Sequence, residues 1–179
     1  MRTYWMQTPR LGFSRWQPQD GALAQQLWGD SRVTRFLCVS GRFSPEQVSQ
    51  RLCSEIKSQQ DDGVQYWPVF ALESVELAGC CGLHRFDEDG WELGAHFLPQ
   101  YWGRGICSEA ARAVMDYAFE QLGLRGISAG HHPGNERSRR LITRLGFCYV
   151  GDVYYPPTGL LHPSYRKTAP ALERKGGQL

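Results

Sequence analysis

The chain has 179 residues, of which 41% are hydrophobic and 12% aromatic, and this length and composition are typical of one globular domain with a full-sized core. Twenty Lys and Arg stand against 18 Asp and Glu without a long run of one sign, which excludes the electrostatic footprint of a nucleic-acid-binding protein. No apolar run reaches the roughly 18 residues that span a bilayer, and the start after Met1 is polar, so we expect no signal peptide, no membrane partner and a cytoplasmic protein.

The N-terminal third predicts one strand followed by helices. Residues 11–16 alternate apolar and polar side chains, which is typical of a strand. Asp20 is suited to cap the next helix, and a helical turn is expected over residues 33–37. Ser44-Pro-Glu-Gln carries a capping-box pattern with proline at the first helical position, so it predicts a helix that extends to about Gln60.

The middle of the chain changes to a strand pattern. Residues 66–73, 77–86 and 91–98 are β-type runs separated by short polar links, the second of which is Asp87-Glu-Asp-Gly. Short links between successive strands predict antiparallel pairing. We therefore expect an antiparallel meander.

The meander ends in a turn that contains Gly103 and Gly105 and leads into a helix from roughly Ser108 to Leu122. Glycine lets the backbone turn sharply and expose N–H groups to an anion, and the helix N-terminus adds a favourable dipole. The segment lacks the Gly-x-Gly-x-x-Gly of a dinucleotide fold and the Gly-Lys-Ser/Thr of a P-loop. From the glycines alone, a phosphate cradle and an ordinary strand–helix turn are equally compatible with this stretch.

The last part of the chain alternates strands with a helix. Residues 127–131 read as a strand, 135–145 as a helix ended by Gly146, and 147–155 as another strand, which predicts a parallel crossover. Residues 154–165 are expected to form a long loop before a last strand near 164–168. The fold class is therefore α/β, with a mixed central sheet that is antiparallel in its N-terminal meander and parallel around the glycine turn. We expect one domain, with an ordered core over about 8–168 and a flexible tail over 170–179.

Six cysteines occur without the Cys-x-x-Cys spacing of a zinc site. The neighbours Cys80 and Cys81 would point to opposite faces of a strand. We therefore expect reduced, mostly buried thiols and no bound metal.

The glycine turn resembles a known signature. Gln100-Tyr101-Trp102-Gly103-Arg104-Gly105 is similar to the Gln/Arg-x-x-Gly-x-Gly/Ala acetyl-CoA motif of the GNAT superfamily of N-acetyltransferases. The resemblance continues through Thr8-Pro-Arg-Leu, Trp91-Glu-Leu-Gly and residues 135–147, and includes the branch of ribosomal-protein N-terminal acetyltransferases. It implies acetyl-CoA as cosubstrate and direct attack by a primary amine in a ternary complex. The alternative of another class is a non-catalytic CoA-binding or sensor module of the same fold.

The resemblance also assigns roles around the cofactor. It implies that the pantetheine contacts come from His96, Phe97 and Leu98. It implies that the pyrophosphate lies on the amides of six consecutive residues, Tyr101, Trp102, Gly103, Arg104, Gly105 and Ile106. The Arg104 side chain would add a cation or remain a solvated surface arginine. Asn135 is suited to cap its helix, and the resemblance adds a contact to CoA.

Two residues are the catalytic candidates. Many relatives carry a tyrosine seven residues after the asparagine to protonate the thiolate, but here that position is Ile142, so Ser138 is the expected replacement, with a solvated helix serine as the alternative. Glu92 is the expected base, with an exposed strand carboxylate as the alternative. His84 is the other titratable candidate for the base.

The acceptor is an amine on a small molecule or a protein N-terminus. By the resemblance, the first helical region and the link between the last two strands border its site. The candidate contacts are therefore Trp28, Arg35, Phe36, Tyr154 and Tyr155. Core packing is the alternative for the two N-terminal aromatic residues, and cover of the sheet edge is the alternative for the link. The same link borders a dimer partner in some relatives, so a homodimer is compatible with the sequence.

Overall fold

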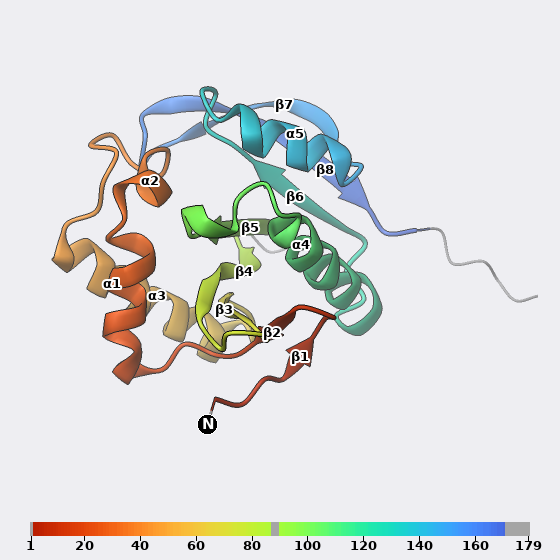
Figure 1. The fold of residues 1–179 in the computed structure, drawn as a ribbon. Coiled ribbons are helices and arrows are strands. Elements are labelled where there is room, and N and C mark those ends of the chain that lie inside the picture. Colours follow the sequence, from red (N-terminus) through yellow and green to blue (C-terminus); the bar gives the residue numbers. More distant parts are fainter. Residues whose placement is uncertain (1, 87–89, 171–179) are drawn as a thin grey trace, which may run out of the picture.

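The computed structural model describes residues 2–86 and 90–170, and its strands form one sheet in the order β1-β2-β3-β4-β5-β6-β8-β7 (Figure 1). Among the first five strands, each neighbouring pair is antiparallel. Their bounds are β1 Met6–Gln7, β2 Leu11–Phe13, β3 Tyr66–Ala71, β4 Leu77–Arg85 and β5 Trp91–Phe97. The predicted meander is therefore confirmed. Its second predicted link, 87–90, lies almost entirely outside the described residues.

The parallel part of the sheet is one strand pair. β5 runs parallel to β6, Gly126–Gly130, and the two strands pair only at Glu92 and Ser128. β7, Cys148–Tyr155, does not pair with β6, because β8, Leu160–Thr168, lies between them and is antiparallel to both. The crossover that follows β6 therefore returns to the sheet at β7, which is separated from β6 by β8.

The prediction of a long loop over residues 154–165 was wrong. Tyr155 pairs with Leu160, so residues 156–159 form a short hairpin turn in which Gly159 adopts a φ of 69°. Pro163 is a residue that disfavours a strand, because proline lacks the N–H of a ladder bond. Residues 160–163 pair with β7 alone, so Pro163 lies where β8 has a single neighbour and the missing donor costs less. The predicted tail lies outside the described residues except for Pro170.

The helices follow the predicted order. They are α1 Gly21–Trp28, α2 Ser31–Thr34, α3 Pro45–Asp61, α4 Ile106–Asp116 and α5 Glu136–Arg144, with 3-10 turns at Pro18–Asp20 and Pro99–Tyr101. The predicted capping box of α3 is present, since Ser44 and Gln47 exchange side-chain and backbone hydrogen bonds. α4 begins two residues earlier than predicted and passes into a π-helical turn at Tyr117–Gln121. Among the described residues, no helix is long and apolar enough to cross a membrane.

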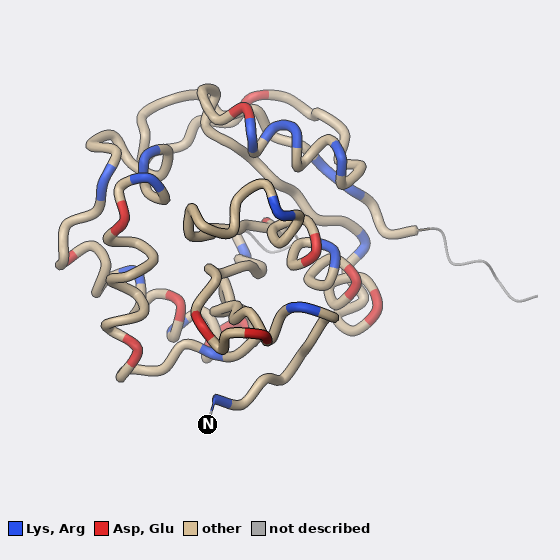
Figure 2. The backbone as a smooth tube through the Cα atoms, viewed as in Figure 1, with Lys and Arg blue, Asp and Glu red and all other residues tan. Residues whose placement is uncertain are grey.

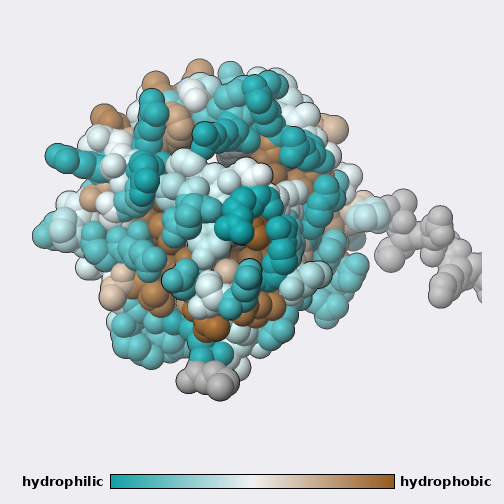
Figure 3. Space-filling model, in the orientation of Figure 1, coloured by the Kyte–Doolittle hydropathy of each residue, from teal (hydrophilic) through white to brown (hydrophobic). Residues whose placement is uncertain are grey.

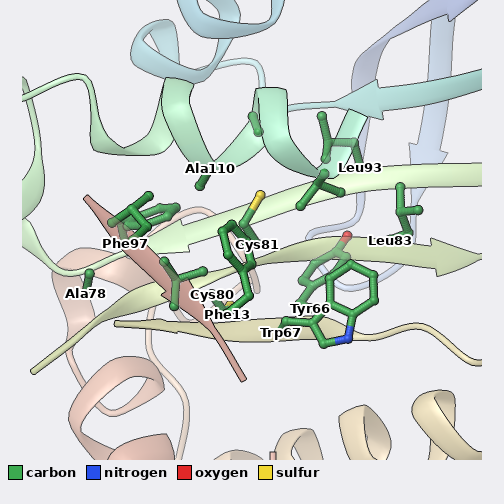
Figure 4. Packing of buried hydrophobic residues seen from close by; sticks show 14 of the residues in the cluster. Phe13, Tyr66, Trp67, Ala78, Cys80, Cys81, Leu83, Leu93, Phe97 and Ala110 are labelled. Atoms are coloured by element: carbon green, nitrogen blue, oxygen red, sulfur yellow. The ribbon is translucent and has the colours of Figure 1, made fainter. Parts of the chain in front are cut away.

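The sheet is covered on both faces. Figure 4 shows Cys81, Leu93 and Phe97 between the strands and Ala110 of α4. Alternate residues of β4 and β5 point to the other face, where α1 and α3 lie (Figure 1). The layer under α4 is therefore apolar, whereas the layer under α1 and α3 holds both buried apolar residues, such as Trp28 and Leu52, and the buried carboxyl group of Glu55.

All six cysteines lie among the described residues and are free. Cys80 and Cys81 are buried, but Cys53 and Cys148 are exposed, so the expectation of mostly buried thiols was wrong for these two. Cys53 lies on the solvent side of α3, and Cys148 begins the edge strand β7.

Candidate active site

The turn between β5 and α4 has the shape expected of an anion cradle. Gly103 and Gly105 adopt φ angles of 71° and 74°, which side chains disfavour, and Gly105 is the N-cap of α4. Within the described chain, no carbonyl or side chain accepts a hydrogen bond from the amides of Gly103, Arg104 or Gly105. A Cβ added to Gly103 would meet no atom within 4 Å, so the turn is open on that side. Free amides at a helix N-terminus fit a phosphate group.

Cations and an aromatic ring border this turn. The Arg137 guanidinium lies 4.9 Å from the ring centroid of Trp102, and the Arg104 guanidinium lies 5.9 Å from that of Tyr101. Figure 2 shows further Lys and Arg residues along α5. The predicted cation at Arg104 is thus beside the cradle, and Arg137 is a second one that the sequence reasoning missed. Both positive charges suit an anionic cofactor.

β5 and β6 stop pairing on the side toward the cradle, and the unpaired stretch between them is called the gap below. The two strands pair only at Glu92 and Ser128 and make no further pairs before β5 ends at Phe97. Two backbone groups predicted to contact pantetheine already have partners, since the Leu98 amide donates to the Ala78 carbonyl and the Phe97 carbonyl accepts from the Trp102 indole at 2.7 Å. The backbone groups that remain for a cofactor in this gap are therefore fewer than the resemblance implied.

Glu92 stands at the point where the strands separate. Burial raises the pKa of its carboxyl group, against the opposing influence of His84 and Arg51. No described residue gives its carboxylate a hydrogen bond, and a Cβ on Gly130 of β6 would lie 3.7 Å from its Oε1 atom. A half-buried carboxylate without a partner, beside the gap, is suited to accept a proton.

Asn135 and Ser138 lie at the start of α5. Asn135 is the N-cap, and its Oδ1 accepts a hydrogen bond from the Ser138 amide at 3.2 Å. The Ser138 side chain is half-buried, and among the described residues its hydroxyl has no hydrogen-bond partner. Ile142 is only 6% exposed and belongs to the core, so the place of the missing tyrosine is taken by an apolar packing residue.

Comparison with known proteins identifies the fold and its chemistry. The chain matches the family model described as acetyltransferase (GNAT) domain over residues 10–148. The chain belongs to this family. It is thus an acyltransferase, and its family uses acetyl-CoA.

Individual relatives agree with this assignment. The chain is 27% identical to the uncharacterized N-acetyltransferase p20 of Bacillus licheniformis, over 78% of this chain and 80% of that protein. Its fold is similar to that of a GNAT-family acetyltransferase from Bacillus anthracis, with a TM-score of 0.77 at 23% identity over 91% and 97% of the two chains. It is also similar to that of RimL, a ribosomal L7/L12 alpha-N-protein acetyltransferase, with a TM-score of 0.78 at 16% identity over 94% and 95%.

In this GNAT acetyltransferase, the predicted acceptor residues do not all meet. Trp28 is fully buried, packs on Trp16, and donates from its indole to Nδ1 of His96 at 3.1 Å, so it is a core residue beneath the site. Burial lowers the pKa of His96 to about 3, which keeps the imidazole neutral and able to accept that bond. Arg35 is exposed, with its guanidinium 5.2 Å from the Phe36 ring.

Phe36 and Tyr155 do belong to one cluster. The ring centroids of Phe36 and His132 are 4.8 Å apart. The His162 ring continues the cluster, with its centroid 5.5 Å from that of His132 and 4.7 Å from that of Tyr155. The amide of Val39 also donates to Pro157 in the hairpin turn at 3.0 Å, so the segment after α2 contacts the β7–β8 hairpin. Tyr154 is 60% exposed, because successive strand residues point to opposite sides. The sequence analysis assigned neither His132 nor His162 to the acceptor site.

A buried polar network was also missed. Glu55 of α3 is fully buried, and its Oε1 accepts from the Arg51 guanidinium at 2.7 Å. Its Oε2 accepts from the Tyr66 amide at 2.7 Å and lies 2.9 Å from Nε2 of His84, the cross-strand neighbour of Glu92. The available signal was the pair Arg51 and Glu55, four residues apart and beside the apolar stripe of their helix.

Glu55→Ala should destabilise the fold strongly, because it leaves a buried guanidinium and a backbone amide without their acceptor. Burial opposes ionisation of Glu55, but Arg51 and His84 outweigh it and hold the pKa below its usual value. We expect the free energy of unfolding, measured in denaturant, to fall by about 3 kcal/mol or more. The stabilisation that ionised Glu55 contributes should be present above the usual glutamate pKa and lost as the pH falls through the lowered folded-state pKa.

The matched control is Lys57→Ala, which breaks an exposed ion pair with Asp61 on the same helix. Exposed pairs contribute little to stability. The control should therefore leave the denaturation midpoint almost unchanged. Equal losses in the two variants would contradict a central role for Glu55.

Metal chemistry was not expected for this site. Within residues 2–86 and 90–170, no group of three or more His, Cys, Asp or Glu side chains is arranged to hold a metal ion.

Proposed function

We propose that this acyltransferase transfers the acetyl group of acetyl-CoA to a primary amine by direct attack in a ternary complex. The observation that carries the proposal is the Glu92 carboxylate, which has no hydrogen-bond partner among the described residues and has a raised pKa at the point where β5 and β6 stop pairing. The cradle at Gly103 and Gly105 lies at the end of the same strand. A cofactor on the cradle with its thioester in the gap would bring the reacting carbon toward that base.

The chain's residues have complementary tasks in this reaction. Glu92 accepts a proton from the amine, directly or through one water, so that the nitrogen lone pair can form the new C–N bond at the acetyl carbon. As the C–S bond breaks, the electron pair leaves with the sulfur and Ser138 donates a hydrogen bond to the resulting thiolate. Solvent protonates the thiolate, and Glu92 returns to solvent the proton that it took from the amine. Backbone amides of the cradle bind the pyrophosphate, and Arg104 and Arg137 add positive charge. Asn135 fixes the turn before Ser138.

The acceptor enters, in our proposal, from the side bordered by Phe36 and Tyr155. Tyr155 is close enough to the proposed base for their charges to interact. Burial raises the pKa of the Tyr155 hydroxyl, and the charges of Arg51 and Glu92 both influence it. A protein N-terminus is one acceptor class that suits such an open border, and RimL, a structural neighbour, acts on one. A small amine is the other class.

The direct test is release of coenzyme A from acetyl-CoA in the presence of a panel of amines. The panel contains a peptide with a free N-terminus, the same peptide with its N-terminus acetylated, spermidine and propylamine. We expect release that depends on a free amine. Absence of release with every amine, in a protein that binds acetyl-CoA, would favour the non-catalytic CoA-binding module instead.

Ser138→Ala should lower kcat by about tenfold to a hundredfold while the KM for acetyl-CoA changes little. The reason is that the hydroxyl assists only the departing sulfur. The matched control is Ser49→Ala on α3, whose hydroxyl donates to a carbonyl of its own helix at 3.1 Å. Full turnover in Ser138→Ala would return this serine to the helix surface.

A further inference from the structure

Tyr66 of β3 has a ring that is fixed on several sides. It stacks on the imidazole of His84 with ring centroids 3.9 Å apart and planes inclined by 13°. The Arg51 guanidinium lies 5.1 Å from the ring centroid, and His96 approaches it edge-on at 5.7 Å. The residue is only 6% exposed. These contacts all involve the ring, so they hold Tyr66 in place without using its hydroxyl.

The tip of the phenol reaches β5. Tyr66 pairs with Gly82 of β4, and Gly82 pairs with Gly94 of β5, so the three residues lie in one row across the sheet. A Cβ on Gly94 would lie 2.1 Å from both Cζ and the hydroxyl oxygen of Tyr66. The phenol therefore occupies the space where a side chain of Gly94 would be.

This position places the hydroxyl beside the proposed base. Residues two apart on a strand point to the same face about 7 Å from each other, so Glu92 and His96 flank Gly94 on the side where the hydroxyl lies. No described residue forms a hydrogen bond with the Tyr66 hydroxyl, and its oxygen is not completely sealed from solvent. A donor or acceptor on a bound molecule could therefore reach it.

We infer that the Tyr66 hydroxyl accepts an N–H hydrogen bond from the acceptor amine, and that this bond selects primary amines over N-methylated ones. The inference rests on the proposed function. A neutral primary amine carries two N–H groups and one lone pair. One N–H can point to Glu92 and the other to Tyr66, which leaves the lone pair for the thioester carbon. A secondary amine has one N–H and must leave one of the two oxygens without its bond, and sites that bind by such bonds reject analogues that lack them.

The test compares propylamine with N-methylpropylamine in the wild type and in Tyr66→Phe at saturating acetyl-CoA. Phenylalanine keeps the ring on His84 and removes only the hydroxyl. We expect kcat/KM for propylamine to fall by about tenfold and that for N-methylpropylamine to change little, so that the preference for the primary amine shrinks by about tenfold. The KM for acetyl-CoA and the melting temperature should stay close to the wild-type values.

The matched control is Tyr4→Phe. Tyr4 also has a buried hydroxyl without a partner among the described residues, but its ring lies against Phe70 at the other end of β3. This variant should keep the wild-type preference.

An unchanged preference in Tyr66→Phe, or an equal loss with both amines, would overturn the inference while leaving the proposed function intact. If the wild type acetylates no amine at all, the proposed function fails and the inference fails with it.

Discussion

Glu92→Gln is expected to lower kcat/KM for the amine by about a hundredfold or more near neutral pH. The substitution keeps the size of the side chain but removes its ability to accept a proton. In the wild type the rate should rise as the pH increases through the raised pKa of Glu92, because the base must be ionised, and level off above it. Initial rates across a pH series, with acetyl-CoA saturating, measure both effects.

The control for this variant is Glu76→Gln, which changes an exposed glutamate in the link between β3 and β4. It should match the wild type. The KM for acetyl-CoA should be similar in all three proteins, since Glu92 does not belong to the cradle. A Glu92→Gln enzyme with the wild-type pH profile would transfer the role of base to His84 or to water.

Gly105→Val should weaken acetyl-CoA binding by tenfold or more, equivalent to about 1.4 kcal/mol. Gly105 has a φ of 74°, where a β-branched residue is strained, and it begins the helix at which the pyrophosphate is proposed to bind. Valine would both shift the backbone and place methyl groups in the approach of the anion. Isothermal titration calorimetry with acetyl-CoA measures the loss.

Gly63→Val provides the matched control for backbone strain. Gly63 has the same φ of 74°, with open space around it, and it follows α3 rather than the cradle. We expect a similar loss of stability but wild-type affinity for acetyl-CoA. Undiminished affinity in a folded Gly105→Val protein would remove the glycine turn from the cofactor site.

The features that depend on neighbouring residues were predictable from the sequence. The capping box at Ser44 and the N-cap at Asn135 are local, because in each the hydrogen-bonded residues lie three positions apart. The parallel pair of β5 and β6 followed from element order. Insertion of β8 between β6 and β7 did not follow, because Pro163 hides a strand that has only one neighbour at that point.

The polar network was not predictable in the same way. Glu55, Tyr66 and His84 are separated by 11 to 29 positions in the sequence, and only the pairing of β3 with β4 under α3 brings them together. The glycine that leaves room for the Tyr66 phenol, Gly94, likewise carries no signal of its own, since it reads as an ordinary strand glycine until its register is known. The catalytic roles of Glu92 and Ser138 stay predictions, which kinetic measurements on the variants test.

Initial-rate kinetics over a grid of acetyl-CoA and amine concentrations decide whether the acetyl group is transferred directly within a ternary complex. The amine is the most reactive member of the panel, and the readout is coenzyme A released before the substrates are depleted. Because both substrates must be bound before the acetyl group moves, we expect double-reciprocal lines that intersect. Parallel lines, together with an acetylated enzyme in the absence of amine, would indicate a covalent acyl-enzyme intermediate and contradict the account.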